Sequence, residues 1–118
     1  MRKIISRLIV GIAVIAGSSV AVLPTANATT YYGAIAVSSD GSIGKAWDYP
    51  WSSDARNAAL SSCGRSDCSV LASFSDCGAV GYSPGAGMYN GGTGSTRSVA
   101  ESNARRYTDS YIVASVCN

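Results

Sequence analysis

The sequence predicts an α+β fold that contains the same ββαβ unit twice, with antiparallel sheets, two short helices and disulfide crosslinks. The first observation is a repeat. At an offset of 45, Gly-Ala-Ile at 33–35 matches Gly-Ala-Val at 78–80, and at an offset of 42, VLASF at 70–74 matches IVASV at 112–116. The second is the order of patterns within each copy, which is strand, strand, helix, strand. The third is a set of four cysteines behind an export signal, which is typical of disulfide-bonded secreted domains.

Residues 1–28 have the composition of a secretory signal peptide. Three basic residues occur within the first seven, residues 8–23 are almost continuously apolar, and small residues end the segment at Ala28. The alternative is an uncleaved membrane anchor. We favour cleavage after Ala28, because the apolar run is shorter than the roughly 20 residues that a bilayer requires. We therefore expect no membrane association after cleavage.

Cleavage leaves residues 29–118, which we expect to form one domain of two repeats, at about 32–76 and 77–118. The whole chain has a net charge of +2, but three of its basic residues leave with the signal. The remaining part has six basic and seven acidic residues, and hence a net charge of −1. A nearly neutral domain offers no electrostatic basis for binding nucleic acid or an anionic membrane, so we expect neither as a partner.

Each copy begins with a predicted hairpin. In the first copy, the short apolar strand 32–38 ends at a Ser-Ser-Asp-Gly turn signal and leads into a second strand over 43–49. In the second copy the turn is SPGAG at 83–87, followed by a weaker strand at 88–91. The two strands of each hairpin form the start of an antiparallel sheet.

A short, alanine-rich helix follows each hairpin. The first begins at Ser52 or Ser53 and stops at Gly64, a residue suited to the left-handed conformation that ends helices. The second carries a predicted capping box formed by Ser98 and Glu101. The expected inner face of the first helix comprises Ala55, Ala58, Ala59 and Ser62. That of the second comprises Ala100, Ala104 and Tyr107.

The four cysteines are expected to form two disulfides, Cys63–Cys68 and Cys77–Cys117. Cys63 closes the first helix and Cys68 opens the next strand, so a local bond would hold that turn. Cys77 begins the first strand of the second copy and Cys117 ends its last strand, and these positions meet if the strands are antiparallel neighbours. The spacing of the cysteines is far from that of zinc sites and no histidine accompanies them, so we expect no metal and no cofactor.

Three segments resemble a known family. The stretches YGAIAVSSDG, CGRSDC and VLASFSDCGAVGYSPGAG are similar to the domain of unknown function family 4189, and the resemblance spans Tyr32 to Cys117. It implies a small exported bacterial protein of duplicated ββαβ build, without an established general activity. Family members often carry a further cysteine pair at the end of the second helix, where this sequence has Thr108.

We expect no catalysis, because the chain contains no histidine. Its absence removes the commonest general base near neutral pH and excludes Ser-His-Asp and Cys-His arrangements. Most of the acidic residues have structural positions available to them, at predicted turns or helix starts; examples are Asp40, Asp54, Asp67 and Glu101. A hydrolase that uses a pair of carboxylates remains an alternative, because their separation in space decides that question.

The stretch WDYPW at 47–51 is the best indication of a binding site. Trp47, Tyr49 and Trp51 alternate, so along a strand they would share one face. An exposed row of aromatic rings suits a protein or glycan partner. The competing interpretation, which we favour, is that this face packs under the first helix and supplies bulk that alanine lacks. Pro50 argues that the strand ends there, so Trp51 could lie at its rim.

We therefore expect a secreted, non-catalytic domain, monomeric or homodimeric, that binds an extracellular or host component as an effector or an inhibitor-like module. It would be free or associated with the cell wall, and its protein or glycan partner is unknown. The alternatives are a structural protein of the cell envelope and the carboxylate hydrolase.

The disulfide prediction is tested by the intact mass of residues 29–118. Under non-reducing conditions the mass should be four hydrogens lower than after full reduction, because each disulfide removes two. A mass equal to that of the reduced chain would contradict the expectation.

Overall fold

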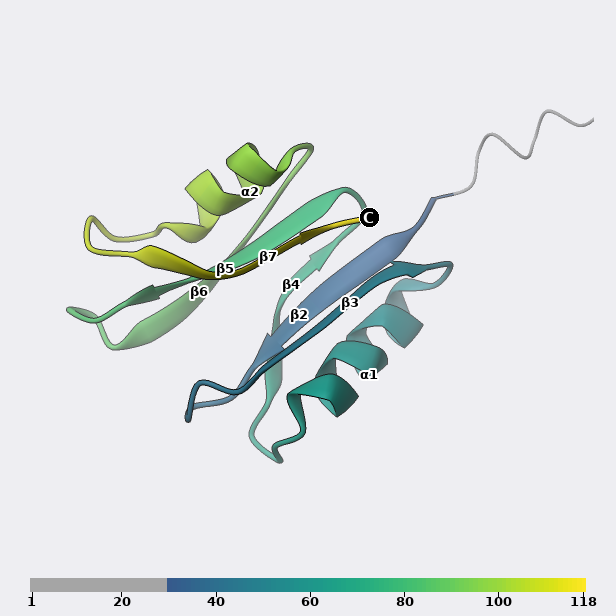
Figure 1. Cartoon of the computed structure of the whole chain (residues 1–118), viewed down its shortest axis with the longest axis horizontal. Helices are drawn as coiled ribbons and strands as arrows, with labels where there is room; N and C mark the ends of the chain where they lie inside the picture. The colour runs from purple at the N-terminus through teal and green to yellow at the C-terminus, as the bar shows by residue number, and fades with distance from the viewer. Residues whose placement is uncertain (1–29) are drawn as a thin grey trace, which may run out of the picture.

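The computed structural model describes residues 30–118, so the predicted signal peptide at 1–28 lies outside the described residues. Two three-stranded antiparallel sheets lie face to face, and one helix covers the outer face of each sheet (Figure 1). This confirms the expected α+β fold with two antiparallel sheets and two short helices.

The two halves have the same order of elements. The first half consists of β2 (Tyr32–Val37), β3 (Ile43–Tyr49), α1 (Ser52–Cys63) and β4 (Ser69–Phe74). The second half consists of β5 (Cys77–Ser83), β6 (Met88–Gly94), α2 (Arg97–Ala104) and β7 (Tyr111–Cys117). The sheets have the strand orders β3-β2-β4 and β6-β5-β7, so the first strand of each half is central in its sheet.

An irregularity of the sheets also repeats. The register between β2 and β4 shifts between Ile35 and Ala36, and the register between β5 and β7 shifts between Val80 and Gly81. The facing positions on β2 and β5 are 45 residues apart, and the extra residues, Leu71 of β4 and Val113 of β7, are 42 apart, which are the two offsets of the sequence repeat. Bulges are specific features of a fold rather than accidents, so their recurrence supports a duplicated ββαβ unit.

Helix α1 packs on its sheet through small side chains. Ala55 and Ala59 are completely buried, and the helix ends at Gly64, which has the left-handed φ of 74°. The expectation for Ser62 was wrong: its side chain is exposed, and Cys63 is buried instead. Ala55, Ala59 and Cys63 follow one another in steps of four, which keeps all three on one side of the helix.

Helix α2 differs from the expectation at both ends. Its N-cap is Thr96, whose Oγ1 accepts a hydrogen bond from the amide of Val99 at 3.2 Å. The predicted capping box at Ser98 was wrong. The backbone is still extended at Thr96 and the helix begins at Arg97, so Ser98 lies within the first turn and is not the N-cap. The inner face at Tyr107 was also wrong: the helix ends at Ala104, and the side chain of Tyr107 is 41% exposed.

A buried aromatic ring lies between the two sheets. Phe74, the only phenylalanine in the chain, contacts Gly33 of β2 and Gly78 of β5, the equivalent residue of the other half. A Cβ atom on Gly33 would lie 2.5 Å from the ring, and one on Gly78 would overlap it. Around the ring lies the buried inter-sheet core: Ile35, Val37, Ala72, Val80, Ala114 and Val116.

The structure contains two disulfides, and their pairing is the one that the sequence predicts. Cys63 and Cys68 have their Cα atoms 6.3 Å apart and connect the end of α1 to the start of β4. Cys77 and Cys117 lie directly opposite each other on β5 and β7, with a Cα separation of 4.0 Å. The second bond joins residues 40 positions apart and holds the end of the chain on the central strand of its sheet.

The contact between Gly78 and Phe74 generates a stability prediction. The substitution Gly78→Ala should lower the free energy of unfolding by about 1–3 kcal/mol, because a methyl group would overpack the ring. The companion substitution Phe74→Leu should reduce the cost of Gly78→Ala when the two are combined, because it removes the clashing edge of the ring. Urea unfolding of the two single variants and the double variant measures this coupling.

The matched control is Gly87→Ala, since nothing lies within 4 Å of the place of that Cβ and only the positive φ of 65° is unfavourable. If Phe74→Leu changes the effect of Gly87→Ala as much as that of Gly78→Ala, the ring contact does not carry the coupling.

Candidate functional site

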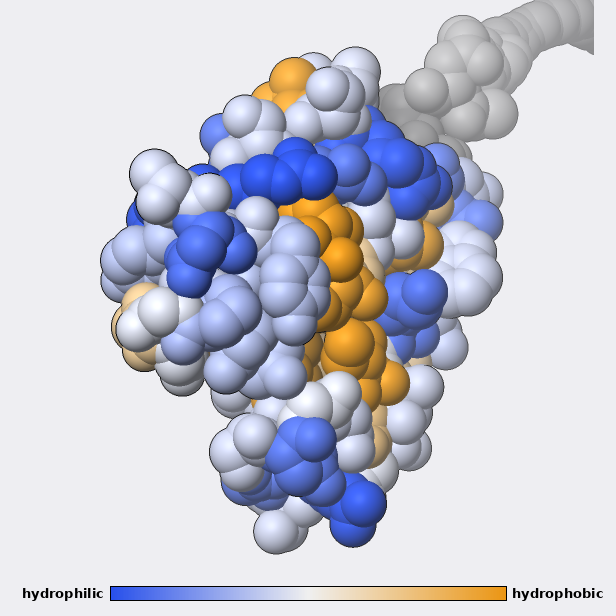
Figure 2. All heavy atoms as spheres, turned by 60° about the vertical axis from the view of Figure 1, so that its left-hand side comes forward, coloured by the Kyte–Doolittle hydropathy of each residue, from blue (hydrophilic) through white to orange (hydrophobic). Residues whose placement is uncertain are grey.

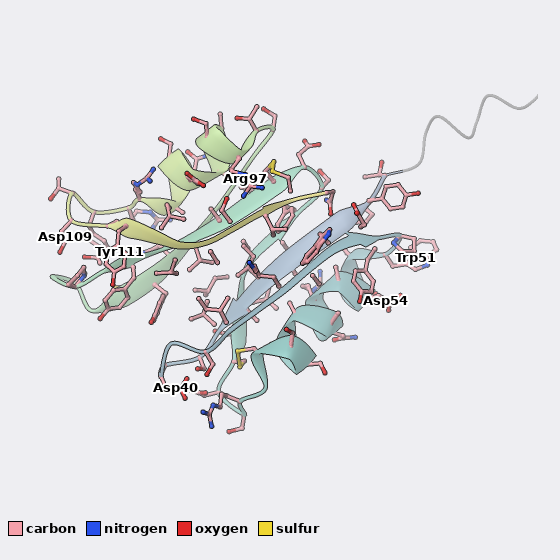
Figure 3. All side chains as sticks on the ribbon, in the orientation of Figure 1. Asp40, Trp51, Asp54, Arg97, Asp109 and Tyr111 are labelled. Carbon is pink, nitrogen blue, oxygen red and sulfur yellow. A yellow bond between two sulfur atoms is a disulfide. The ribbon has the colours of Figure 1, made fainter. Side chains whose placement is uncertain are left out.

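The three aromatic residues of WDYPW do not share one environment. Trp47 is 48% exposed and Trp51 is 67% exposed, whereas Tyr49 packs with the cluster beneath α1. The expectation that this face packs under the first helix was therefore wrong for Trp47, whereas Trp51 is exposed as the position of Pro50 suggested. Figure 3 shows Trp51 at the end of the molecule opposite to Tyr111 and Asp109.

A bulge in β3 explains this separation. Tyr32 pairs with Tyr49 but Ala34 pairs with Ala46, so β3 contains one extra residue at this point. The extra residue reverses the alternation, and Tyr49 joins Ala46 on the side of α1 while Trp47 does not. Asp48, within the bulge, has a φ of 62° and is the non-glycine residue with positive φ among residues 30–118.

The last residue of the chain holds this bulge in place. The side-chain oxygen of Asn118 accepts a hydrogen bond from the amide of Asp48 at 2.8 Å. Its side-chain nitrogen donates to the carbonyl oxygens of Tyr31, at 3.1 Å, and Ser75, at 2.8 Å. One amide group therefore connects the start of β2, the bulge of β3 and the link between the two halves.

One edge of the two-sheet stack is closed. A Cβ atom on Gly91 of β6 would overlap the carbonyl oxygen of Leu71 on β4, so the backbones of these two edge strands are in contact there. Gly91 is required at this close approach, because any side chain would separate the strands. At the opposite edge, between β3 and β7, Ile43 and Val113 pack against the inter-sheet core and remain partly exposed, as Leu71 and Tyr89 do at the first edge.

We define the β3–β7 seam as the side chains that lie along this second edge: Ile43, Lys45, Trp47, Tyr111 and Val113. On β3, Gly44 and Ala46 face α1, so Ile43 and Lys45 point to the other side. Ile43 and Val113 are partly buried and pack against the inter-sheet core. Figure 2 shows an apolar strip between the two sheets, with paler and more polar side chains on both sides of it.

A tyrosine cluster lies at one end of the seam. The ring of Tyr82 is 4.6 Å from that of Tyr89 and 6.0 Å from that of Tyr111, measured between centroids. Sequence reasoning missed this cluster. The register of the β5–β6 hairpin could have shown part of it, because counting back from the turn places Tyr82 directly opposite Tyr89.

Three aspartates hold the hairpin turns. Asp40 accepts from the hydroxyl of Ser38, Asp67 from the amide and hydroxyl of Ser39, and Asp109 from the hydroxyl of Ser83 and the amide of Gly85. The equivalent serines Ser38 and Ser83 are both buried, which makes these partners necessary. The bonds to Ser38 and Ser83 therefore hold one carboxylate at each hairpin turn. The bonds to Ser39 hold the carboxylate of Asp67 at the turn of the first hairpin as well.

These hydrogen bonds stabilise the ionised carboxylates. The Ser38 hydroxyl, with help from the Ser42 amide, lowers the pKa of Asp40 from 3.8 to about 2. The Ser39 hydroxyl lowers the pKa of Asp67, and the Ser83 hydroxyl lowers that of Asp109. Asp40 also forms an ion pair with Arg65, with 3.1 Å between Nε and Oδ2.

The fold and the two crosslinks define a class: small disulfide-bonded α+β domains built from two ββαβ units. More narrowly, the chain belongs to the family described as Domain of unknown function (DUF4189), whose profile matches residues 32–117. Protein Rv1269c of Mycobacterium tuberculosis is 47% identical over 94 residues, which cover 79% of this chain and 74% of the relative. Protein Rv1813c of the same organism is 43% identical over 89 residues, or 75% of this chain and 61% of the relative.

A solved structure has the same fold. The NMR structure of Rv1813c from Mycobacterium tuberculosis matches with a TM-score of 0.65 at 35% sequence identity, and the match covers 92% of this chain and 98% of the other. The two disulfides suggest an oxidising environment for the folded domain. Within residues 30–118, neither helix is long and apolar enough to cross a bilayer.

The lowered pKa values predict a loss of stability in acid. A carboxyl whose pKa is lower in the folded state contributes stability above its unfolded value, and that contribution disappears as the pH falls through the folded value. For Asp40 the window runs from about pH 3.8 down to about pH 2. Urea unfolding across this window should show a falling midpoint, and Asp40→Asn should make the decline smaller. An unchanged slope in a variant that lacks Asp40, Asp67 and Asp109 would contradict this prediction.

Proposed function

We propose that this protein is exported by cleavage after Ala28 and acts outside the cell as a non-catalytic binding module. Its partner is a protein that contacts the tryptophan-bearing end of the domain, around Trp47 and Trp51. The single observation that carries the proposal is the exposure of both tryptophans, 48% and 67%, in a domain whose core is short of large side chains.

The distribution of residue sizes supports this proposal. Most of the buried apolar residues are alanines, and the largest completely buried apolar side chains are Ile35 and Val80. A thin core would gain stability from burying a tryptophan, because large apolar surfaces contribute most to folding. With both tryptophans exposed, the fold does not gain the stability that their burial would contribute. Their exposure therefore favours a role in contacting another molecule.

The shape of the surface favours a protein over a small molecule. A depression of about 320 Å³ lies between β3 and α1, next to Trp47, and its lining includes Tyr49, Ala58 and Ser62. This volume is at the lower limit for small-molecule sites. A depression of this size beside an exposed tryptophan suits one inserted side chain of a protein partner.

The electrostatics support a non-catalytic role. A carboxylate hydrolase needs one carboxyl with a raised pKa, which remains protonated and donates its proton to the leaving group. Asp40 and Asp67 lie at neighbouring turns, but hydrogen bonds lower the pKa of both. Each is committed to holding a loop, and neither is suited to act as a general acid near neutral pH.

The proposal is tested by affinity capture with residues 29–118 as bait, using secreted and cell-surface fractions of the producing organism. We expect the wild-type domain to capture a specific protein. The captured amount should fall about tenfold or more when Trp47→Ala and Trp51→Ala are combined, because exposed tryptophans dominate interface energies. The matched control is Tyr107→Ala, which removes another exposed aromatic side chain, 41% exposed, from outside the WDYPW segment.

Thermal unfolding must show that both variants are folded. Equal capture by all three proteins would contradict a role for the tryptophans. Capture of a polysaccharide in place of a protein would assign the surface to a glycan.

A further inference from the structure

We infer that a depression at the β4–β6 edge receives the side chain of a lysine or an arginine from a protein partner. The depression lies beside the turn of the first hairpin, at the other end of the first sheet from Trp51 (Figure 3). The inference goes beyond the proposed function, because it does not depend on either tryptophan. It is carried by the shape of the depression, by the carboxylate at its rim and by a difference between the two halves of the fold.

The floor of the depression is apolar and continues the inter-sheet core. Val37 of β2, Leu71 of β4 and Tyr89 of β6 line it, and its volume is about 270 Å³. Leu71 and Tyr89 pack against the core yet remain partly exposed. A Cβ atom on Gly41 would lie 3.2 Å from the hydroxyl oxygen of Tyr89, so this side chain reaches from β6 to the first turn. The volume is small for a small-molecule site and suits one long side chain.

The rim of the depression is polar, and its one charged group is a carboxylate. Ser38, Ser39, Asp67 and Ser69 complete the lining, which contains no lysine or arginine. Asp67 accepts from the amide and the hydroxyl of Ser39 with the same oxygen, Oδ2. It therefore holds the turn through one oxygen, and Oδ1 can accept from a ligand. The Ser39 hydroxyl lowers the pKa of Asp67, so the carboxylate is charged near neutral pH.

The surroundings of Asp67 have an excess of negative charge. Asp40 lies close enough for its carboxylate to repel that of Asp67. Arg65 is engaged by Asp40, with 3.1 Å between Nε and Oδ2, and within residues 30–118 Asp67 has no ion pair of its own. Lys45 lies on the opposite edge of the first sheet, and Arg106 lines a separate depression after α2. A cation supplied by another molecule would therefore complement this rim.

A long basic side chain matches every part of the depression. Its methylene groups can cover Val37 and Leu71 while its charged end reaches the carboxylate of Asp67. The ring of Tyr89 favours the same ligand, because the face of an aromatic ring attracts an ammonium or guanidinium group. An apolar side chain would cover the floor but leave the carboxylate without a partner, and an acidic side chain would be repelled.

The second half of the fold has the same turn but larger residues beside it. Ser69 of β4 lies opposite Val37 of β2, and the equivalent pair on β7 and β5 is Tyr111 and Tyr82. The rings of these two tyrosines are 6.0 Å apart between centroids, so they stand where the first half has a serine and a valine. Asp109 holds the second turn beside them. The turn-holding carboxylate is thus common to both halves, but Ser69 leaves room beside it in the first.

The test uses residues 29–118 labelled with nitrogen-15 and four synthetic peptides of equal length. The peptides consist of glycine and serine except for a central lysine, arginine, norleucine or glutamate. The lysine and arginine peptides should cause saturable shifts of the amide signals of Ser39, Asp67 and Leu71. They should bind about three- to tenfold more tightly than the norleucine peptide, which has the methylene chain without the charge. Added salt should weaken this preference, because Asp67 is exposed.

Three variants test the residues of the depression. Asp67→Asn keeps an oxygen that can accept from Ser39 but removes the charge, so it should lower the affinity for the basic peptides about three- to tenfold. The matched control Asp109→Asn makes the same change at the second turn and should leave binding unchanged. Ser69→Tyr copies the residue of the second half into the depression and should abolish saturable binding although Asp67 remains.

The inference would be overturned if neither basic peptide caused saturable shifts, or if the norleucine or glutamate peptide bound as tightly as they do. It would also be overturned if Asp67→Asn and Asp109→Asn had equal effects, or if Ser69→Tyr left binding unchanged in a protein whose amide spectrum shows that it is folded. The proposed function would stand in each case, because both tryptophans remain in every variant and their role is measured by affinity capture.

Discussion

The contact of Phe74 with two glycines sets the distance between the sheets, and the rest of the structure depends on that distance. Gly33 and Gly78 are equivalent positions of the two halves, and both leave room for the same ring. The ring therefore lies near the axis that relates the halves. Only one half can supply it, and the other has Val116 at the corresponding place. The two halves therefore differ at this position, where one large side chain fills the space between the sheets.

The two outer layers, between each helix and its sheet, are also built from small side chains. Alanines face each sheet from its helix, which allows the helices to lie close but buries little apolar area per residue. The two disulfides add stability that this thin core does not supply. One holds the turn after α1, and the other holds the last strand, β7, at Cys77. Both tryptophans and Tyr111 remain exposed, and Trp51 and Tyr111 lie at opposite ends of the stack (Figure 3). This distribution suits a rigid body that presents rings on its surface.

The two edges of the stack differ in how closely the backbones of their strands approach each other. At β4 and β6, the contact of Gly91 with Leu71 brings the backbones together, and the side chains of Leu71 and Tyr89 are partly buried there. At β3 and β7, the strands carry Ile43 and Val113, whose side chains are only partly covered. Duplication supplies two similar layers. Glycines and bulges then make the two edges differ: Gly91 lets β6 touch β4, and the bulge at Asp48 leaves Trp47 exposed on β3.

Local patterns in the sequence determined the order of the elements, the duplication and the pairing of the cysteines, because hairpin signals, alanine spacing and antiparallel geometry act over short stretches or through the repeat. The start of α2 was missed because Thr96 competes with Ser98 for the same role, and backbone conformation decides between them. Only the tertiary structure decided where Trp47 and Tyr49 point. Alternation along β3 places them together, but a bulge at Asp48 separates them, and Asn118 stabilises that bulge from 70 residues away. No pattern within the strand contains that hydrogen bond.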